Sequence, residues 1–475
     1  MSPVRRTTIL LCLLLPVFRL RAEVSLAPVF GDHMVIQQGV TLPVWGTASP
    51  GEKVIVACAG REARAVADGS GAWRVILRPI SFTGERCELI VNGSNRIEIH
   101  DVLPGDVWIA AGEAEMASPL SESAVGGRAA AVPDPGTRFF VRDASGKGRW
   151  VVVSPETSPP LPSIPFFFAR DLRAARKTPI GVIDCTTTSA APIASWIGPS
   201  GLAGMAPPDR SGTAPVVPPS RLFRNLIGPL VPFAITGVIW NQGTSDEGRN
   251  ARRHRLFLSH LVRDWRRVWE QGPFPFLMLL PSGRGSSDGP AVEPYLGERG
   301  EPSRAWPWIR EGVAATGRLP NIGIASATDL GGNDGAGFDP LVAGRRLALT
   351  ARHLVYGEEI ACTGPVLRHA RIEQNRIRLF FDGAKGGLTL GSAPGSGEGT
   401  VFPVNSSLKG FAVRGKEGRW FPAEARIDGE TVLLSCDAVP RPLEARYDWK
   451  SLPDGNLYDR TGLPARPFRT DSDQP

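Results

Sequence analysis

Short apolar and β-branched runs separated by turn residues fill the chain from residue 23 to residue 104. Clusters such as Asp68-Gly-Ser-Gly71 lie between the runs, and these residue types are typical of tight turns. The pattern predicts a small N-terminal β-sandwich over residues 23–104. Its strands are expected at Thr41 to Trp45, Val54 to Ala57, Trp73 to Leu77, Glu88 to Val91 and Arg96 to His100.

The middle of the chain alternates compact apolar runs with helical stretches. This alternation predicts an α/β domain over residues 105–360 with a mostly parallel sheet. Strands are expected at Val107 to Ala111, Pro179 to Ile183, Ala234 to Trp240, Phe274 to Leu280 and Ile322 to Ala327, and helices at Ser220 to Leu230, Arg255 to Trp269 and Leu341 to Tyr356. Two segments rich in Gly, Ser, Ala and Pro, Ala117 to Gly136 and Ser282 to Glu301, are expected to be surface loops that border a site.

The last quarter of the chain returns to strand patterns. It predicts a second β domain over residues 361–475, with hairpin turns at Asp382-Gly383 and Asp428-Gly429. The expected strands are Ala370 to Ile377 continuing to Phe381, Lys409 to Val413, Glu424 to Ile427 and Thr431 to Ser435.

The first 22 residues have the pattern of an export signal. The apolar run Ile9 to Phe18 follows Arg5 and Arg6 and precedes a small-residue cleavage site ending at Ala22. The run is too short to span a bilayer. We therefore expect a secreted or periplasmic protein without a membrane anchor.

The charge of the chain argues against a nucleic-acid partner. Removing the leader with its four arginines lowers the net charge from +7 to +3. The remaining arginines are scattered along the sequence instead of forming a basic stripe, which nucleic-acid binding would favour. Oligomeric state is not determined by any of these features.

Five cysteines remain after removal of the leader: Cys58, Cys87, Cys185, Cys362 and Cys436. Cys58 with Cys87, and Cys362 with Cys436, each lie within one predicted β region, so either pair could form a disulfide in an oxidising compartment. Spacing alone proves neither bond. No two cysteines have a zinc-site spacing, so we expect no metal and no cofactor.

Many ordered segments of the chain resemble the sialate O-acetylesterase family, whose catalytic domain is an SGNH-type hydrolase fold. Each motif alone is weak, but their order along nearly the whole chain makes coincidence implausible. The segments are Leu26 to Gln38, Pro43 to Gly46, Gly105 to Trp108, Gly112 to Met116, Pro179 to Ile183, Asn225 to Leu230, Gly237 to Gly243, Arg263 to Arg266, Trp306 to Arg310, Gly344 to Leu347, Asn456 to Tyr458, Gly462 to Ala465 and Pro467 to Thr470. The resemblance implies a three-layer SGNH-like α/β domain and a serine-based ester hydrolysis.

The resemblance also shows that this chain lacks the family's nucleophile. The family serine lies in a Gly-Gln-Ser-Asn-Met turn, and the matching position is Ala114. A methyl group cannot attack a carbonyl. Glu113 and Glu115 replace the flanking Gln and Asn, and their charge has the wrong sign for a site that must stabilise an oxyanion.

The family's base is missing as well. An Asp-x-His-Pro segment normally carries it, and here Asp339 precedes Pro340 at the histidine position, with Gly337 at the orienting aspartate. The nearest histidine, His353, lies well down the following helix. Asp334 is a further carboxylate that could lie near the site.

Two further blocks are partly changed. The family's Gly-Gly-Thr oxyanion turn is replaced by Thr186 to Pro192, whose β-branched and proline residues restrict the backbone. In the third block Gln242 and Gly243 are kept while Thr244 replaces a glutamate. The resemblance implies a substrate-binding set of Glu113, Glu115, Trp196, Gln242 and Gly243, with no intact catalytic residue.

Several side chains carry competing interpretations. Glu113, Glu115, Asp334 and Asp339 could form a calcium or magnesium site or a carboxylate pair for sugar chemistry, but solvated carboxylates in a decayed cleft are favoured. Substitute serine nucleophiles are interpreted as loop residues, and the histidines as structural, surface or helix-packing residues. The tryptophans are expected in the core, with Trp196 as the best candidate for a sugar platform. The residues concerned are Ser118, Ser121, Ser123, Ser245, His33, His254, His260, Trp45, Trp73, Trp108, Trp196, Trp240, Trp306 and Trp308.

Three functional hypotheses follow. The first is an exported, catalytically impaired relative that retains a cleft for an acetylated glycan or a sialic-acid-like sugar. The second is an active carboxylic-ester hydrolase that uses an unorthodox serine or an activated water. The third is a structural surface protein whose β domains bind partners. Because fold does not fix function, site chemistry must decide among them.

Overall fold

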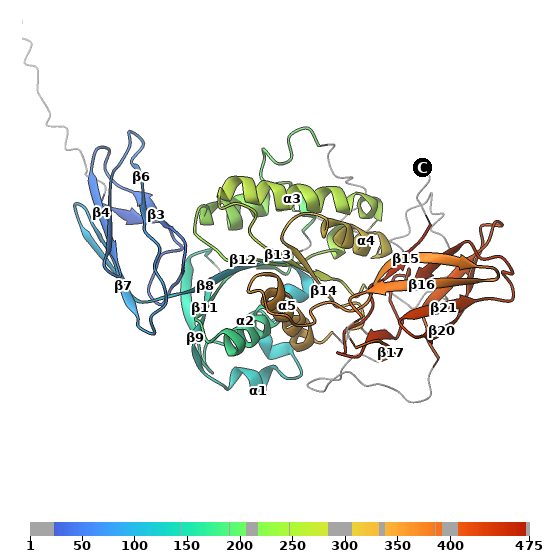
Figure 1. Ribbon diagram of the computed structural model, residues 1–475. Helices are drawn as coiled ribbons and strands as arrows, with labels where there is room; N and C mark the ends of the chain where they lie inside the picture. The colour runs from blue at the N-terminus through green and yellow to red at the C-terminus, as the bar shows by residue number, and fades with distance from the viewer. Residues whose placement is uncertain are drawn as a thin grey trace, which may run out of the picture.

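The computed structural model describes residues 23–143, 145–189, 191–205, 217–246, 248–283, 306–331, 338–384, 386–391 and 407–471. The predicted leader, residues 284–301 of the second predicted loop, and Asp334 and Gly337 lie outside these ranges. A central α/β domain lies between β strands contributed by the two ends of the chain (Figure 1). Within the described residues, no helix combines the length and apolar character needed to cross a membrane.

Two sheets form the N-terminal β domain, as the sequence pattern predicts. Alternate residues of the strands face the core; Val54, Val56 and Cys58, for example, are each at most 2% exposed. One sheet contains β1 (Ser25–Leu26), β3 (Leu42–Thr47) and β6 (Ala72–Leu77), and the other contains β4 (Lys53–Cys58), β5 (Arg61–Val66), β7 (Cys87–Asn92) and the first part of β8 (Arg96–Glu113).

Strand β8 joins the N-terminal domain to the central sheet. Its 18 residues include both Arg96 to His100 and Val107 to Ala111, which the sequence predicts as separate strands. The first part pairs antiparallel with β7, and the second pairs parallel with β11 and β12. Near its middle, the buried Arg138 guanidinium donates to Asp101 at 2.9 Å and to the His33 carbonyl at 2.9 Å. His33 is therefore structural, as expected.

The central sheet is mixed and mostly parallel. Its strand order is β10-β9-β11-β8-β12-β13-β14, and neighbours in this order are parallel except for β10 and β9. Helices cover both faces, which explains why the inner strands are continuously apolar. The strands not introduced above are β2 (Val35–Gln37), which pairs with β8, and β9 (Asp134–Arg142), β10 (Gly148–Val153), β11 (Ile180–Thr187), β12 (Gly237–Asn241), β13 (Phe276–Leu280) and β14 (Ile322–Ser326).

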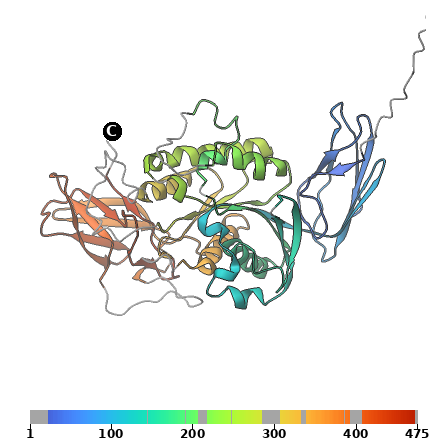
Figure 2. The same cartoon turned by 180° about the vertical axis from the view of Figure 1, so that it is seen from behind.

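The helices lie in two groups on opposite faces of this sheet, as both views show (Figures 1 and 2). One group contains α2 (Ser163–Arg176) and α5 (Pro340–Leu354), and the other contains α3 (His254–Trp269) and α4 (Trp306–Thr316). Gly344 lets α2 and α5 approach closely, because a Cβ atom there would lie 2.7 Å from the Cβ of Phe167. This packing gives the Gly344 motif a structural role.

Some predicted elements in the central domain are wrong. The expected loop Ala117 to Gly136 contains the short helix α1 (Gly126–Ala130) and the first residues of β9. Strand β10 and helices α2 and α4 lack a predicted counterpart. By contrast, the expected helix over Ser220 to Leu230 is confirmed as a helical segment, although most of it is a π-helix (Phe223–Ile227) followed by a 3-10 helix (Gly228–Leu230) instead of a regular α-helix.

The C-terminal β domain has two four-stranded sheets and a short ladder. The predicted long strand ending at Phe381 is in fact a hairpin, because Gln374 adopts a left-handed φ of 54° between β15 and β16. The hairpin turn at Asp428-Gly429 is confirmed, whereas Asp382-Gly383 leads into a strand that pairs elsewhere. The strands are β15 (Val366–Glu373), β16 (Arg376–Asp382), β21 (Thr431–Ser435) and β20 (Glu424–Asp428); β19 (Trp420–Pro422), β18 (Phe411–Arg414), β22 (Glu444–Tyr447) and β24 (Phe468–Arg469); and the ladder β17 (Leu388–Leu390) with β23 (Leu457–Asp459).

A buried arginine fastens this domain to the central one. Arg310 of α4 donates to the carbonyl of Ser282 at 2.8 Å and to that of Ser451 at 3.3 Å. Asp448, 3% exposed, accepts the N–H groups of Gly455 at 2.8 Å and Asp454 at 3.2 Å. Burial lowers the pKa of Arg310 to about 10 and raises the pKa of Asp448 to about 7.

The raised pKa of Asp448 predicts a pH-dependent stability. The folded chain keeps a proton that the unfolded chain releases near pH 4, so the stabilisation is complete below that pH and is lost as the pH rises through about 7. Between pH 5 and pH 8, we expect the natural chain to lose about 2–3 kcal/mol more unfolding free energy than Asp448→Asn. Urea unfolding of both chains at the two pH values measures this difference. Equal losses would show that Asp448 titrates normally.

Candidate functional site

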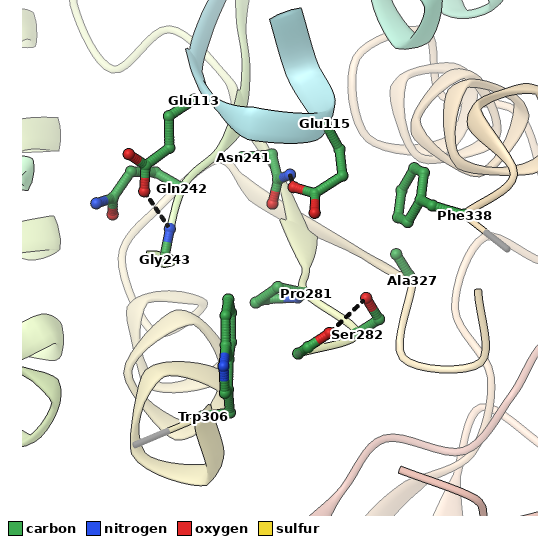
Figure 3. Close-up of a pocket in the computed structure, with 11 residues that line it drawn as sticks. Glu113, Glu115, Asn241, Gln242, Gly243, Pro281, Ser282, Trp306, Ala327 and Phe338 are labelled. Atoms are coloured by element: carbon green, nitrogen blue, oxygen red, sulfur yellow. Dashed lines mark hydrogen bonds between the residues drawn. The ribbon is translucent and has the colours of Figure 1, made fainter. Parts of the chain in front are cut away.

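A cleft opens at the carboxyl ends of the central strands, beside the end of β8. Strand β8 has β11 on one side and β12 on the other, and the helices adjoining these strands in sequence, α2 and α3, lie on opposite faces of the sheet. Ligands of open α/β sheets bind at such a point. The cleft has an empty volume of about 320 Å³, including its open mouth, and the described residues that line it are Glu113, Glu115, Asn241, Gln242, Gly243, Pro281, Ser282, Gly283, Trp306, Ala327 and Phe338 (Figure 3).

Glu113 occupies the centre of the hydrogen-bond network behind the cleft. It is the last residue of β8 and is 2% exposed. Its carboxylate accepts the N–H groups of Ala191 at 2.9 Å, Ser245 at 2.9 Å and Gly243 at 3.3 Å, and also the Ser245 hydroxyl. Burial raises the pKa of this carboxyl, while the hydrogen bonds from Ser245 and Ala191 oppose the rise. The side chain therefore binds the turns that follow β11 and β12.

Gln242 supports the same two turns. Its amide nitrogen donates to Asp246 Oδ2 at 2.8 Å and to the Ala191 carbonyl at 3.3 Å. Asp246 Oδ2 also accepts the N–H of Ile193 at 3.2 Å and lies 3.5 Å from Nδ1 of the fully buried His254. His254 is therefore a helix-packing residue, and Gln242 holds the site together through its nitrogen.

Glu115 is the second acid of the cleft. It lies in the 3-10 turn Ala114–Ala117 after β8, and the Asn241 amide donates to it at 3.4 Å. Figure 3 shows the two side chains facing each other across the floor of the cleft. Across the residues that the structure describes, no three His, Cys, Asp or Glu side chains are grouped so as to hold a metal ion.

Asp339 has a role that the sequence did not predict. It is the N-cap of α5, and one carboxylate oxygen accepts the N–H groups of Leu341 at 2.9 Å and Val342 at 3.2 Å. An N-cap aspartate followed by proline is a favourable start of a helix. Its neighbour Phe338 lines the cleft. Of the four acids considered for an acidic pocket, only Glu113 and Glu115 are among the described residues that line the cleft.

Trp196 corrects the expectation of a sugar platform. Its ring is 0% exposed and packs against Trp240 with ring centroids 5.4 Å apart, so no face is available to a ligand. Its carbonyl accepts the Trp265 indole N–H at 2.9 Å. Trp306 is the tryptophan that lines the cleft. Its position directly after a long Gly- and Pro-rich segment is the sequence feature that favours a role at a site.

Comparison with known proteins agrees with the resemblance found in the sequence. No family model matches the chain. Curated sialate O-acetylesterases from Pongo abelii and Homo sapiens are each 26% identical to it, over 93% of this chain and 91% of theirs. A solved structure of a carbohydrate acetylesterase from Xanthomonas citri is 30% identical, with a TM-score of 0.81 over 94% of this chain and 100% of that chain. The chain belongs to the sialate O-acetylesterase family.

The positions that the motif resemblance assigns to the family's nucleophile and base are Ala114 and Asp339 in this chain. Ala114 opens the turn directly after β8, where the family's motif has its serine. Four serines lie near this turn or after β12, namely Ser118, Ser121, Ser123 and Ser245. Of these four, only Ser245 donates a hydrogen bond to an acid, which is Glu113. In the part of the chain that the structure describes, no histidine is hydrogen-bonded to Ser118, Ser121, Ser123 or Ser245. His353 is exposed near the end of α5 and lies 3.0 Å from the Glu358 carbonyl.

Proposed function

We propose that this chain is an exported, catalytically impaired member of the sialate O-acetylesterase family. Its central domain is of the SGNH type, with three layers, and its cleft binds an acetylated sugar without hydrolysing it. Export rests on the pattern of the first 22 residues. The proposal of a sugar ligand rests on the relatives, which are a sialate O-acetylesterase and a carbohydrate acetylesterase.

The hydrogen bonds of Glu113 are the observation that carries the proposal. Ester hydrolysis by an acyl-enzyme route develops negative charge beside the nucleophile, and free N–H donors must receive it. The N–H groups of Ala191, Gly243 and Ser245 already donate to a buried carboxylate of this chain. A substrate oxyanion would have to compete with that internal carboxylate for the same donors.

The helix cap formed by Asp339 supports the same proposal. In an esterase this position would carry a histidine that exchanges a proton with substrate. Here one carboxylate oxygen serves two backbone N–H groups of α5. The residue that replaces the base therefore stabilises the fold, which is expected where selection for catalysis has ended.

One observation favours the alternative of an active hydrolase with a substitute nucleophile. The Ser245 hydroxyl donates to the buried Glu113 carboxylate, whose raised pKa makes it a stronger base than an exposed glutamate. However, Ser245 is absent from the described lining of the cleft. The N–H groups nearest to Ser245 and Glu113 already donate to the Glu113 carboxylate. An oxyanion formed by attack of Ser245 would therefore lack stabilisation.

Hydrolysis and binding assays on the purified natural chain test the proposal. With p-nitrophenyl acetate and an O-acetylated sialic acid, we expect release of acetate at the protein-free rate. Calorimetry is expected to show binding of the acetylated sugar. Trp306 is itself only 3% exposed, so Trp306→Ala is compared after thermal unfolding has shown that it is folded; it is expected to weaken binding by at least 10-fold, whereas the buried-core control Trp196→Phe leaves binding within 2-fold.

Turnover above the protein-free rate would contradict the proposal. In that case Ser245→Ala and the matched control Ser123→Ala identify the nucleophile, because only the first removes the hydroxyl bonded to Glu113. Absence of both turnover and sugar binding would leave the third hypothesis, a partner-binding surface protein.

A further inference from the structure

The two cysteines of the N-terminal β domain lie in contact. Cys58 is the last residue of β4 and Cys87 the first residue of the adjacent antiparallel strand β7. Cys58 is paired with Leu89, so Cys87 is its diagonal neighbour on the same face of the sheet. Their Sγ atoms are 3.7 Å apart. This distance corresponds to a weak hydrogen bond between two thiols that are 29 residues apart in the sequence.

The two thiols differ in exposure and acidity. Cys58 is 2% exposed and belongs to the hydrophobic core, whereas Cys87 is half-buried. The hydrogen bond with Cys58 lowers the pKa of Cys87 below its usual range. Cys87 is therefore the thiol that ionises and meets a reagent first, because thiolate character and access control cysteine reactivity.

We propose that Cys58 and Cys87 form a disulfide in the exported protein. The bond requires the sulfur atoms to close from 3.7 Å to about 2 Å, a movement that rotation of two side chains supplies. It would link the end of β4 to the start of β7 and enclose β5 and β6 within one covalent loop. This inference rests on the proposed export, since disulfides persist in oxidising compartments.

The oxidation proceeds by thiol–disulfide exchange with an oxidising protein disulfide. The Cys87 thiolate attacks one sulfur of that disulfide and releases the other as a thiolate. The Cys58 thiol then loses its proton and attacks Cys87 Sγ, which releases the second sulfur of the oxidant. Two protons and two electrons leave the cysteine pair, and the oxidant becomes a dithiol.

The other cysteines do not share this arrangement. Cys185 is buried beside Arg142, and burial raises its pKa to about 11, so it reacts slowly. Cys362 and Cys436, the second predicted pair, are both half-buried. The proposal is therefore limited to the N-terminal pair.

Thiol counting on the exported full-length chain tests the inference. After denaturation and alkylation without reductant, we expect three modified cysteines, namely Cys185, Cys362 and Cys436, and a cross-linked peptide containing Cys58 and Cys87. Reduction before alkylation should raise the count to five. Cys58→Ser should give four without reductant, and the control Cys185→Ser should give two.

Five alkylated cysteines in the exported chain, or a cross-link that joins Cys58 to another partner, would overturn the inference. The mass of the N-terminal peptide in the same sample reports whether the leader was removed, which separates failure of export from failure of the bond. If the chain is not exported, the purified folded protein is treated with oxidised glutathione. The intramolecular bond is then expected, and mixed disulfides on both cysteines without that bond would count against the inference.

Discussion

Replacing Glu113 with Gln is expected to raise, by about 100-fold, the esterase rate of a chain that carries Ala114→Ser and Asp339→His. The double variant restores the family's nucleophile and base types, but it leaves a buried carboxylate next to the new serine. At a separation of about 4–6 Å and an effective dielectric constant of 20, that charge opposes an oxyanion by about 3–4 kcal/mol, which corresponds to about 100-fold or more in rate. Glutamine removes the charge and keeps one oxygen, which can accept either the N–H of Ala191 or those of Ser245 and Gly243, because these donors bond to different oxygens of the carboxylate.

The measurement is the rate of p-nitrophenyl acetate hydrolysis by the double variant, with and without Glu113→Gln. Glu122→Gln in the same double variant is the matched control, because Glu122 is an exposed acid in a neighbouring turn. We expect this control to change the rate less than 2-fold. Equal rates with Glu and Gln at position 113, whether at background or above it, would show that its charge does not oppose catalysis.

The double variant is expected to be less stable than the natural chain, so its stability must be measured together with its rate. Asp339→His removes an N-cap that accepts two N–H groups of α5, and loss of such a cap costs about 1 kcal/mol. Thermal unfolding of each variant therefore accompanies the assay. A rate gain among variants of equal stability can then be attributed to the chemistry of the cleft.

Most of the fold was predictable because buried strands and helix faces have recognisable apolar patterns in the sequence. Strands buried on both faces, such as β12 and β13, are continuously apolar, and α3 has a regular apolar face. Helices α2 and α4 and strands β9 and β10 were not predicted. Strand β9 contains Arg138 and Arg142, which are used internally by hydrogen bonds to distant backbone carbonyls. A local pattern cannot show that a charged residue will find such a partner.

The site was predicted only in part, because a local pattern does not show contacts between residues that are far apart in the sequence. The resemblance of motifs assigns the nucleophile and base positions to Ala114 and Asp339, and the absence of a hydroxyl or an imidazole there follows from the sequence itself. The function of Glu113 in the fold depends on acceptor–donor pairs that are 78 and 132 residues apart in the sequence. Trp196 was assigned to the cleft by family analogy, but its ring lies in the core against Trp240, and its carbonyl accepts the Trp265 indole N–H. Long-range packing decided both cases.

A buried ion pair behind the cleft connects three parts of the chain. Arg346 of α5 is 3% exposed and binds both carboxylate oxygens of Asp329, at 2.6 Å and 2.8 Å. The Tyr458 hydroxyl of β23 donates to the same carboxylate at 2.9 Å. The motif residues Arg346 and Tyr458, which are far apart in the sequence, therefore meet at one acid and join the C-terminal β domain to α5.

Arg346→Ala is expected to lower the free energy of unfolding by about 3–5 kcal/mol, because it leaves the Asp329 carboxylate buried without its cation. Tyr458→Phe removes a single hydrogen bond to that carboxylate and should cost about 1 kcal/mol.

The matched control is Arg345→Ala in the same helix, where a side chain that is 47% exposed lies 3.3 Å from Asp171; its loss should cost less than about 1 kcal/mol. Urea unfolding measures all three, and a double-mutant cycle with Asp329→Asn isolates the coupling between Arg346 and Asp329. Equal losses for Arg345→Ala and Arg346→Ala would mean that the buried pair does not hold the C-terminal domain against α5, and that the apolar contacts between them suffice.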